Sequence, residues 1–157
     1  MLGAWAVRAL RTPRHVTAWR TGAAGERRTA DMLQPLERRG GHVLHDRAIR
    51  GSRANLDHVA TGNRGIAYID TRNWQARHAS VSVSREGDIL WYGRYPQNRS
   101  LTTVERQAPQ LAIALRRDGW DIDVQPVIAV HGAPVGRRGR LVFDGVTVID
   151  APVSGAA

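Results

Sequence analysis

Residues 53–74 read RANLDHVATGNRGIAYIDTRNW, and this stretch predicts a β-hairpin. Two runs of β-forming residues flank GNRG at residues 62–65, which is a short turn signal. With residues 63–64 as a two-residue loop, pairing is symmetric about the loop and Asp57 lies directly opposite Asp70. Directly opposed side chains lie about 5 Å apart on one face, where like charges are destabilising. A sheet that only had to fold would avoid this pair of carboxylates.

A bound cation would reverse the effect of the pair, because magnesium is held by one or two carboxylates together with waters or substrate phosphates. Arg72 and Asn55 fall on the same face, two residues along each strand. The hairpin therefore predicts two acids, a permanent cation and an amide in one place. The plainer interpretation is that the aspartates solvate an exposed face or cap a turn. A register slip of one residue would also move Asp57 to the opposite face.

The length and composition predict a single domain with a real core. The chain has 157 residues, of which 42% are hydrophobic, and this excludes wholesale disorder. No stretch approaches the roughly 20 apolar residues that span a bilayer, and Arg8 and Arg11 interrupt the apolar N-terminal run. Without cysteine there are no disulfides or cysteine-bound metals. We expect a cytoplasmic protein with a basic N-terminal arm (1–20), one domain (21–153) and a short tail (154–157).

The charge of the chain favours a polyanionic partner. The net charge is +9, and all 23 basic residues are arginine. Arginine pairs bidentately with phosphate and stacks on bases, so nucleic acid is the first candidate and an anionic membrane surface a distant second. A coding bias would account for arginine in place of lysine but not for the excess of positive charge. The run RRGR at residues 137–140 is either a solvated loop or a phosphate contact.

A first helix is predicted from about residue 22 to residue 39, with Pro35 ending or kinking it early. Glu26 lies four residues before Ala30 and seven before Leu33, so it shares the side of the helix that faces the core. There it either complements the dipole of the first helical turn or points into an acidic site.

The other predicted elements give an α/β (α+β) fold with a mixed central sheet flanked by helices. A strand at residues 42–49 leads into the hairpin, and a meander follows from residue 78 to residue 92. The capping-box pattern TTVE at residues 102–105 opens a second helix, which Pro109 should kink or shorten and which Gly119 closes. The last elements are strands at 124–131 and 145–150, and the apolar run at 127–130 indicates a strand covered on both faces.

One ordered series of residues resembles the nuclease-related domain (NERD) family, from about residue 21 to residue 150. The matching segments are Gly25-Glu26, Leu44-His45-Asp46, GSRANLDH at 51–58, IDTRNW at 69–74, Gln107, and VHGA at 130–133. That family is placed in the restriction-endonuclease-like superfamily, whose core is a mixed sheet between helices. The superfamily signature is an Asp, then an Asp or Glu, one intervening residue and a Lys, written PD-(D/E)xK.

The resemblance implies a role for each matching residue. Glu26 is the acid of the first helix, Asp57 the first metal-ligating acid and Asp70 the second. Gln107 is the polar helix residue that helps to position the site. The signature lysine falls on Arg72, which departs from the pattern. The implied cofactor is Mg²⁺ or Mn²⁺, held by Asp57 and Asp70 with Glu26 beside them.

The function implied is a metal-dependent nuclease that hydrolyses phosphodiester bonds of DNA. Arg72 would supply the electrostatic part of the lysine's role but not act as a general base, because it stays protonated. The alternatives are a DNA-binding module of the same fold with weakened or absent catalysis, and a purely structural domain.

The residues expected to contact the substrate lie around the hairpin. They are Arg53, Asn55, Asn73 and Trp74. Trp74 either packs at the edge of the site or stacks on a base. His58 is expected on the face opposite Asp57, in contact with the core.

Overall fold

The structure, a computed structural model, describes residues 14–76 and 78–151. Its elements in chain order are α1 (Arg14–Glu37), β1 (His42–Ala48), β2 (Asn55–Gly62), β3 (Gly65–Asn73), β4 (Val81–Val83), β5 (Leu90–Tyr92), β6 (Tyr95–Pro96), α2 (Asn98–Arg117), β7 (Val124–His131), β8 (Arg140–Phe143) and β9 (Val146–Asp150).

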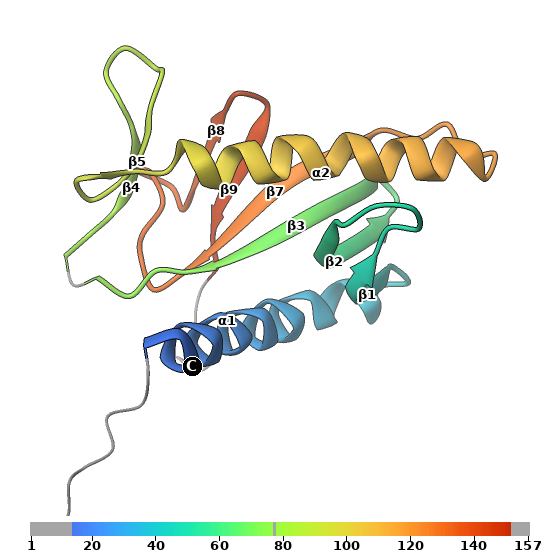
Figure 1. Cartoon of the computed structure of the whole chain (residues 1–157), viewed down its shortest axis with the longest axis horizontal. Helices are drawn as coiled ribbons and strands as arrows, with labels where there is room; N and C mark the ends of the chain where they lie inside the picture. Colours follow the sequence, from blue (N-terminus) through green and yellow to red (C-terminus); the bar gives the residue numbers. More distant parts are fainter. Residues whose placement is uncertain (1–13, 77, 152–157) are drawn as a thin grey trace, which may run out of the picture.

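Six of the strands form one mixed sheet in the order β1-β2-β3-β7-β9-β8. The pairs β3–β7 and β7–β9 are parallel, whereas β1–β2, β2–β3 and β8–β9 are antiparallel. The helices α1 and α2 cover opposite faces of this sheet (Figure 1). The predicted mixed sheet flanked by helices is confirmed, and the arrangement is consistent with a restriction-endonuclease-like fold. No helix within the described ranges is long and apolar enough to cross a membrane.

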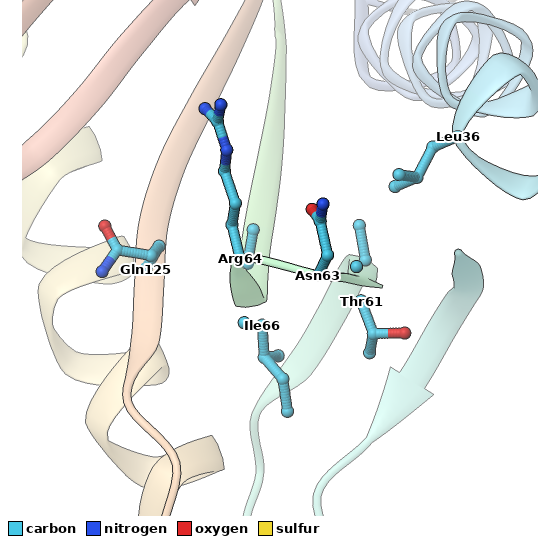
Figure 2. A pocket seen from close by; sticks show the side chains of 10 residues that line it. Leu36, Thr61, Asn63, Arg64, Ile66 and Gln125 are labelled. Carbon is cyan, nitrogen blue, oxygen red and sulfur yellow. The ribbon is translucent and has the colours of Figure 1, made fainter. Parts of the chain in front are cut away.

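The turn end of the β2–β3 hairpin carries a pocket of about 240 Å³. Leu36 of α1, Thr61 and Ile66 of the hairpin, and Gln125 of β7 line it (Figure 2). Arg64 and Asn63, the two loop residues, stand at the same place. This pocket lies at the opposite end of the hairpin from Asp57 and Asp70.

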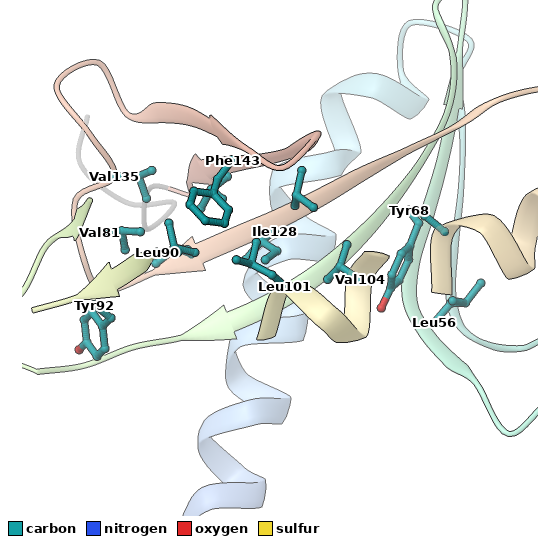
Figure 3. Close-up of a cluster of buried hydrophobic side chains, with 14 of the residues drawn as sticks. Leu56, Tyr68, Val81, Leu90, Tyr92, Leu101, Val104, Ile128, Val135 and Phe143 are labelled. Carbon is teal, nitrogen blue, oxygen red and sulfur yellow. The ribbon is translucent and has the colours of Figure 1, made fainter. Parts of the chain in front are cut away.

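The larger of two hydrophobic clusters lies between the sheet and α2. Leu101 and Val104 of α2 pack there with Ile128 of β7 and Tyr68 of β3 (Figure 3). The smaller cluster lies between the sheet and α1 and includes Leu33. Neighbouring residues of β7 belong to different clusters, so that strand is covered on both faces, as its apolar sequence predicted.

A second sheet, in the order β4-β5-β6, lies between the hairpin and α2 in the chain. It confirms the predicted meander with different limits, because the first strand begins at Val81 rather than at residue 78 and a third strand extends the sheet to Pro96. Leu90 and Val81 are buried in the larger cluster, and Val81 forms a parallel bridge with Val135 after β7. The small sheet therefore shares its core with the main one.

Helix α1 approaches β3 closely at Gly25. A Cβ atom built there would lie 3.0 Å from Asn73 Cβ and 3.1 Å from Thr71 Cγ2, which is tighter than ordinary packing. Glycine at this position thus permits the contact between helix and strand. Residues of α1 further along, Thr29 and Leu33, are buried against the same face of the sheet.

The limits of α1 differ from the prediction. The helix begins at Arg14, so residues 14–20 of the predicted arm are helical, and residues 1–13 lie outside the described residues together with the tail. Pro35 lies in the last turn and the helix continues to Glu37. A proline there removes a single hydrogen bond near the helix end, while Leu36 still packs on the smaller cluster.

The start of α2 was also predicted wrongly. The helix begins at Asn98, and the hydroxyl of Thr102 bonds to the Asn98 carbonyl oxygen at 3.0 Å within the helix, so it caps nothing. Burial of Leu101 draws the first turn into the core and overrides the capping pattern. Pro109 lies inside the helix without ending it, and Gly119, with φ of 90°, follows its end as predicted.

The C-terminal part holds one strand more than predicted. Strand β7 has the predicted bounds, and β9 starts one residue later than expected. The additional strand β8 begins at Arg140, inside the segment that had been interpreted as a loop. Its pairing with β9 buries Phe143, which the short arginine-rich and glycine-rich sequence did not indicate.

Candidate nuclease site

The register of the β2–β3 hairpin is the one predicted. Gly62 pairs with Gly65 and His58 with Ile69, so residues 63–64 form the loop. The next positions outward are Asp57 and Asp70, and there the regular pairing ends. The two acids therefore lie where the two strands part.

Asp57 replaces the missing backbone pairing with its own side chain. Its Oδ2 accepts a hydrogen bond from the backbone N–H of Thr71 at 2.9 Å. The residue is half-buried. A bond of this kind fixes one carboxylate oxygen of Asp57 relative to β3 and leaves the other oxygen without a described hydrogen bond.

Asp70 is buried and paired with Arg72. Arg72 Nε lies 2.6 Å from Asp70 Oδ2, and its Nη2 donates to Asp70 Oδ1 at 3.1 Å. The Asp70 side chain is 7% exposed and that of Arg72 31%. Despite the short ionic contact, neither Oδ2 nor Nε takes part in a well-directed hydrogen bond. The position predicted for the signature lysine thus directly contacts the second acid.

Gln107 of α2 reaches the acids through a tyrosine that the sequence analysis missed. The fully buried Tyr68 donates its hydroxyl to Gln107 Oε1 and lies 3.4 Å from Asp70 Oδ1. Gln107 Nε2 in turn donates to the backbone oxygen of Asn55 at 3.4 Å. The two-residue period of a strand puts Tyr68, Asp70 and Arg72 on one face, so the signal was present in the sequence.

Burial raises the pKa values of the two acids. It raises the pKa of Asp70 to about 7, with Arg72 opposing the shift and Asp57 adding to it. It also raises the pKa of Asp57, against the N–H of Thr71 and the charge of Arg72. The pKa of the Tyr68 hydroxyl is raised as well, chiefly by burial. The charged forms of both carboxylates are therefore disfavoured, even with Arg72 beside them.

Glu26 was predicted to face the core, and this prediction was wrong. The face of α1 that meets the sheet is formed by Gly25, Thr29 and Leu33, which repeat every four residues, and Glu26 is exposed next to it. The prediction took its helical face from Ala30 and Leu33, but Ala30 is only partly buried. Partial burial and the nearby carboxylates raise the pKa of Glu26, so it lies at the rim of the acidic site.

Asp46 is a further carboxylate of this site. The β1–β2 register pairs His45 with His58 and continues beyond Asp46, which stands across from Asp57 without a regular pair. Asp46 has a φ of 50°, and its Oδ1 accepts a hydrogen bond from Asn55 Nδ2 at 2.6 Å. Its charge contributes to the raised pKa of Asp57 and of Glu26. The sequence pattern included this residue, but no role had been predicted for it.

The four predicted substrate contacts divide into two kinds. Arg53 and Asn55 are exposed on the segment that enters β2. Asn73 instead donates its Nδ2 to the backbone oxygen of Thr21 at 2.7 Å and so ties β3 to α1. Trp74 packs on the larger cluster and stacks on Tyr92, with ring centroids 4.9 Å apart. Its position favours packing over base stacking.

Histidines and threonines occupy the opposite face of the sheet. His58 is buried there, as predicted, with its Nδ1 2.7 Å from His45 Nδ1. Thr29 of α1 lies 2.8 Å from His131 Nε2 and accepts a hydrogen bond from Thr71 Oγ1 at 2.9 Å. Burial lowers the pKa of His58 to about 4 and also lowers that of His131. Thr29 therefore joins β3 and β7 to α1, and the two histidines His45 and His58 join β1 to β2.

The arrangement of the acids suits a metal ion that keeps several water ligands better than an ion coordinated by protein side chains alone. In the described residues no three His, Asp or Glu side chains are arranged to hold one ion. Asp57 and Asp70 nevertheless offer carboxylate oxygens, and the buried Oδ2 of Asp70 is in ionic contact with Arg72 but accepts no well-directed hydrogen bond. Magnesium takes oxygen ligands and keeps several waters, so one or two carboxylates with substrate phosphates suffice.

Comparison with known proteins agrees with this geometry. The profile of the family described as "Nuclease-related domain" matches residues 21–131, which include Glu26, Asp57, Asp70, Arg72 and Gln107. Comparisons with curated proteins and with solved structures give no match. The match covers well over half of the chain, from α1 through the end of β7. The chain is therefore a member of the nuclease-related domain family.

Proposed function

We propose that this protein is a metal-dependent nuclease that hydrolyses phosphodiester bonds of DNA. The observation that carries the proposal is the pair Asp57 and Asp70, two carboxylates brought together where β2 and β3 part. A fold without a ligand has little use for two like charges there. Membership of a nuclease-related family also supports the proposed nuclease function.

Asp57 and Asp70 would hold Mg²⁺ or Mn²⁺, with Glu26 as a further carboxylate at the rim. Bound in this way, a divalent ion lowers the pKa of a water molecule and neutralises negative charge on the phosphate. The N–H of Thr71 orients Asp57, and Tyr68 connects Asp70 to Gln107. Gln107 therefore acts as a positioning residue rather than as a ligand.

Arg72 takes the place of the signature lysine. Its guanidinium is permanently charged, so it stabilises the negative charge that develops on the attacked phosphate but accepts no proton from water. We expect Arg53 and Asn55 to contact the DNA backbone, and their exposure near the acids supports this expectation. The net charge of +9 favours binding of that polyanion.

A DNA-binding module with little or no turnover is the second candidate. The ion pair between Arg72 and Asp70 favours it, because a guanidinium already neutralises one of the two acids. Such a module would keep the fold and the basic surface and bind DNA with a strong dependence on salt.

Cleavage of supercoiled plasmid with Mg²⁺ or Mn²⁺ tests the proposal. Asp70→Ala is the site variant, and Asp121→Ala is its control, because Asp121 is an exposed acid in an ion pair with Arg116. We expect nicking by the parent and by Asp121→Ala, and none by Asp70→Ala. Equal nicking by all three would indicate a contaminant and overturn the assignment. DNA binding without nicking by any of them would establish the second candidate.

A further inference from the structure

We propose that the Arg72 guanidinium is a resident counter-cation of Asp70, which a divalent ion must displace before it binds. Arg72 lies one residue beyond Thr71 on the same strand as Asp70 and on the same face. It contacts both carboxylate oxygens of Asp70, at 2.6 Å and 3.1 Å. Those oxygens are the ones that a metal would use.

The ion pair between Arg72 and Asp70 is more buried than the other ion pair in the described residues. Arg116 and Asp121 pair on the surface, with side chains 60% and 83% exposed. Asp70 by contrast is 7% exposed, and a buried carboxylate without a partner is costly. Arg72 therefore performs, in the metal-free protein, part of the neutralising role of an ion.

Arg72 is also able to leave. Its side chain is 31% exposed, and the polar contacts described for it, the ion pair through Nε and the hydrogen bond from Nη2, both go to Asp70, so no other described contact holds it in place. Rotation about its long side chain would free Asp70 and keep the guanidinium within reach of a neighbouring anion.

The destination of the displaced guanidinium follows from its chemistry, and this second step rests on the proposed function. A phosphate of DNA offers the two oxygens that a guanidinium binds best. Metal binding at Asp70 and phosphate binding by Arg72 would then favour each other. Coupling of this kind is reciprocal: DNA tightens metal binding by the same factor as metal tightens DNA binding.

Calorimetric titration with Mn²⁺ in the absence of DNA tests the first step. The proteins are the parent, Arg72→Gln, Arg72→Lys and the control Arg116→Gln, which removes the same charge from the exposed pair. We expect Arg72→Gln to bind Mn²⁺ about tenfold more tightly than the parent at about pH 8, because a nearby opposite charge alters carboxylate affinity by that order. Arg116→Gln should match the parent, and Arg72→Lys should lie between.

Unchanged or weaker Mn²⁺ binding by a folded Arg72→Gln protein would overturn the proposal. A second titration adds a short duplex with phosphorothioate linkages, which resist cleavage. The duplex should tighten Mn²⁺ binding by the parent far more than by Arg72→Gln, and an equal effect on both would overturn the second step.

The outcome is separable from that of the proposed function. Plasmid nicking by the parent without a gain in Mn²⁺ affinity for Arg72→Gln would refute the counter-cation alone. A gain in affinity without nicking would refute the nuclease assignment alone. An absence of Mn²⁺ binding by every variant would refute both.

Discussion

The two faces of β3 differ in what their side chains do. On the α2 side, Tyr68, Asp70 and Arg72 form the acidic site. On the α1 side, Thr71 and Asn73 bond to the helix. A strand alternates its side chains between faces, so neighbouring residues belong in turn to the acidic site and to the contacts that anchor α1. Substitutions on the α1 face should change stability first, and those on the α2 face should change activity first.

Burial also shifts the pKa values of side chains on the two faces in opposite directions. On the α2 face burial raises the pKa of Asp70, which disfavours its charged form. On the α1 face burial lowers the pKa of His58 and His131, which keeps both neutral. On both faces burial therefore disfavours the charged form, and one ring nitrogen of each histidine, His58 Nε2 and His131 Nδ1, has no described hydrogen-bond partner.

The largest effect is expected at the close contact of α1 with β3. Gly25→Val places new atoms against Asn73 and Thr71, and we expect a loss of about 3 kcal/mol in the free energy of unfolding from overpacking. Gly22→Val is the matched control, because nothing lies within 4 Å of a Cβ built at Gly22. Urea denaturation measures both. A loss of equal size in the two variants would refute a specific helix–strand contact.

The next largest effect is expected at Thr29. Thr29→Val removes the hydroxyl shared by Thr71 and His131 and leaves buried polar atoms unpaired, at a cost of about 2 kcal/mol. Thr102→Val on the exposed side of α2 is the control and should change stability by less than about 0.5 kcal/mol. Equal urea midpoints for the parent and Thr29→Val would show that this network contributes nothing.

Protonation of the buried His58 should oppose folding as the pH falls. The pKa of His58 is about 4 in the folded state and 6.5 as the ordinary value, so the unfolded chain binds a proton first. Its contribution to stability is fully present above pH 6.5 and is lost as the pH falls towards 4, with about 2 kcal/mol lost by about pH 5. Urea titrations across this range measure it. In Asp70→Asn, which lacks the opposing carboxylate, a stability that rises on acidification would contradict the assignment.

Two variants sharpen that pH profile. The contribution of Asp70 to stability depends on pH in the opposite direction. Its pKa is raised to about 7 in the folded state, so its ionisation destabilises the fold as the pH rises from the ordinary pKa of an aspartate towards 7. Asp70→Asn should therefore show a steeper loss of stability on acidification than the parent. His42→Gln on the exposed start of β1 should leave the profile unchanged.

The smallest effect on stability is expected at Tyr68. Tyr68→Phe removes the hydroxyl between Gln107 and Asp70, at a cost of about 1 kcal/mol in stability. On the proposed function, kcat should fall about tenfold with KM nearly unchanged, since the lost contact orients a carboxylate rather than binding substrate. Tyr95→Phe, at a residue 54% exposed, is the control. A change confined to KM would argue against a positioning role for Tyr68.

The parts of the fold that follow a simple period were predictable. The turn residues 62–65 gave the hairpin register, and the apolar run of β7 gave that strand with its bounds. Helix starts were not predictable in the same way. Burial of Leu101 overrides the capping pattern at α2, and pairing with β9 turns the segment from Arg140 into a strand. The first effect depends on the core that Leu101 enters, which is built from distant parts of the chain. The second is local, because β8 pairs with β9 across the turn Asp144-Gly145, and this hairpin signal was missed.

For the candidate site, the hairpin acids could be predicted and their neighbours only in part. Asp57, Asp70 and Arg72 share one hairpin, so local geometry relates them. The direction in which Glu26 points depends on the rotation of α1 about its axis. The close packing of Gly25 against the sheet determines that rotation. Asp46 joins the acids only because β1 pairs with β2, a contact that no local pattern encodes.

The backbone at Asp46 has a consequence for the behaviour of the protein at high concentration. Strand β1 is an edge of the main sheet and could accept a strand from another molecule. The left-handed conformation of Asp46, with φ of 50°, breaks the regular run of hydrogen-bonding groups in the middle of that edge. The residue that adds negative charge to the acidic site thus also protects the molecule from edge-to-edge aggregation.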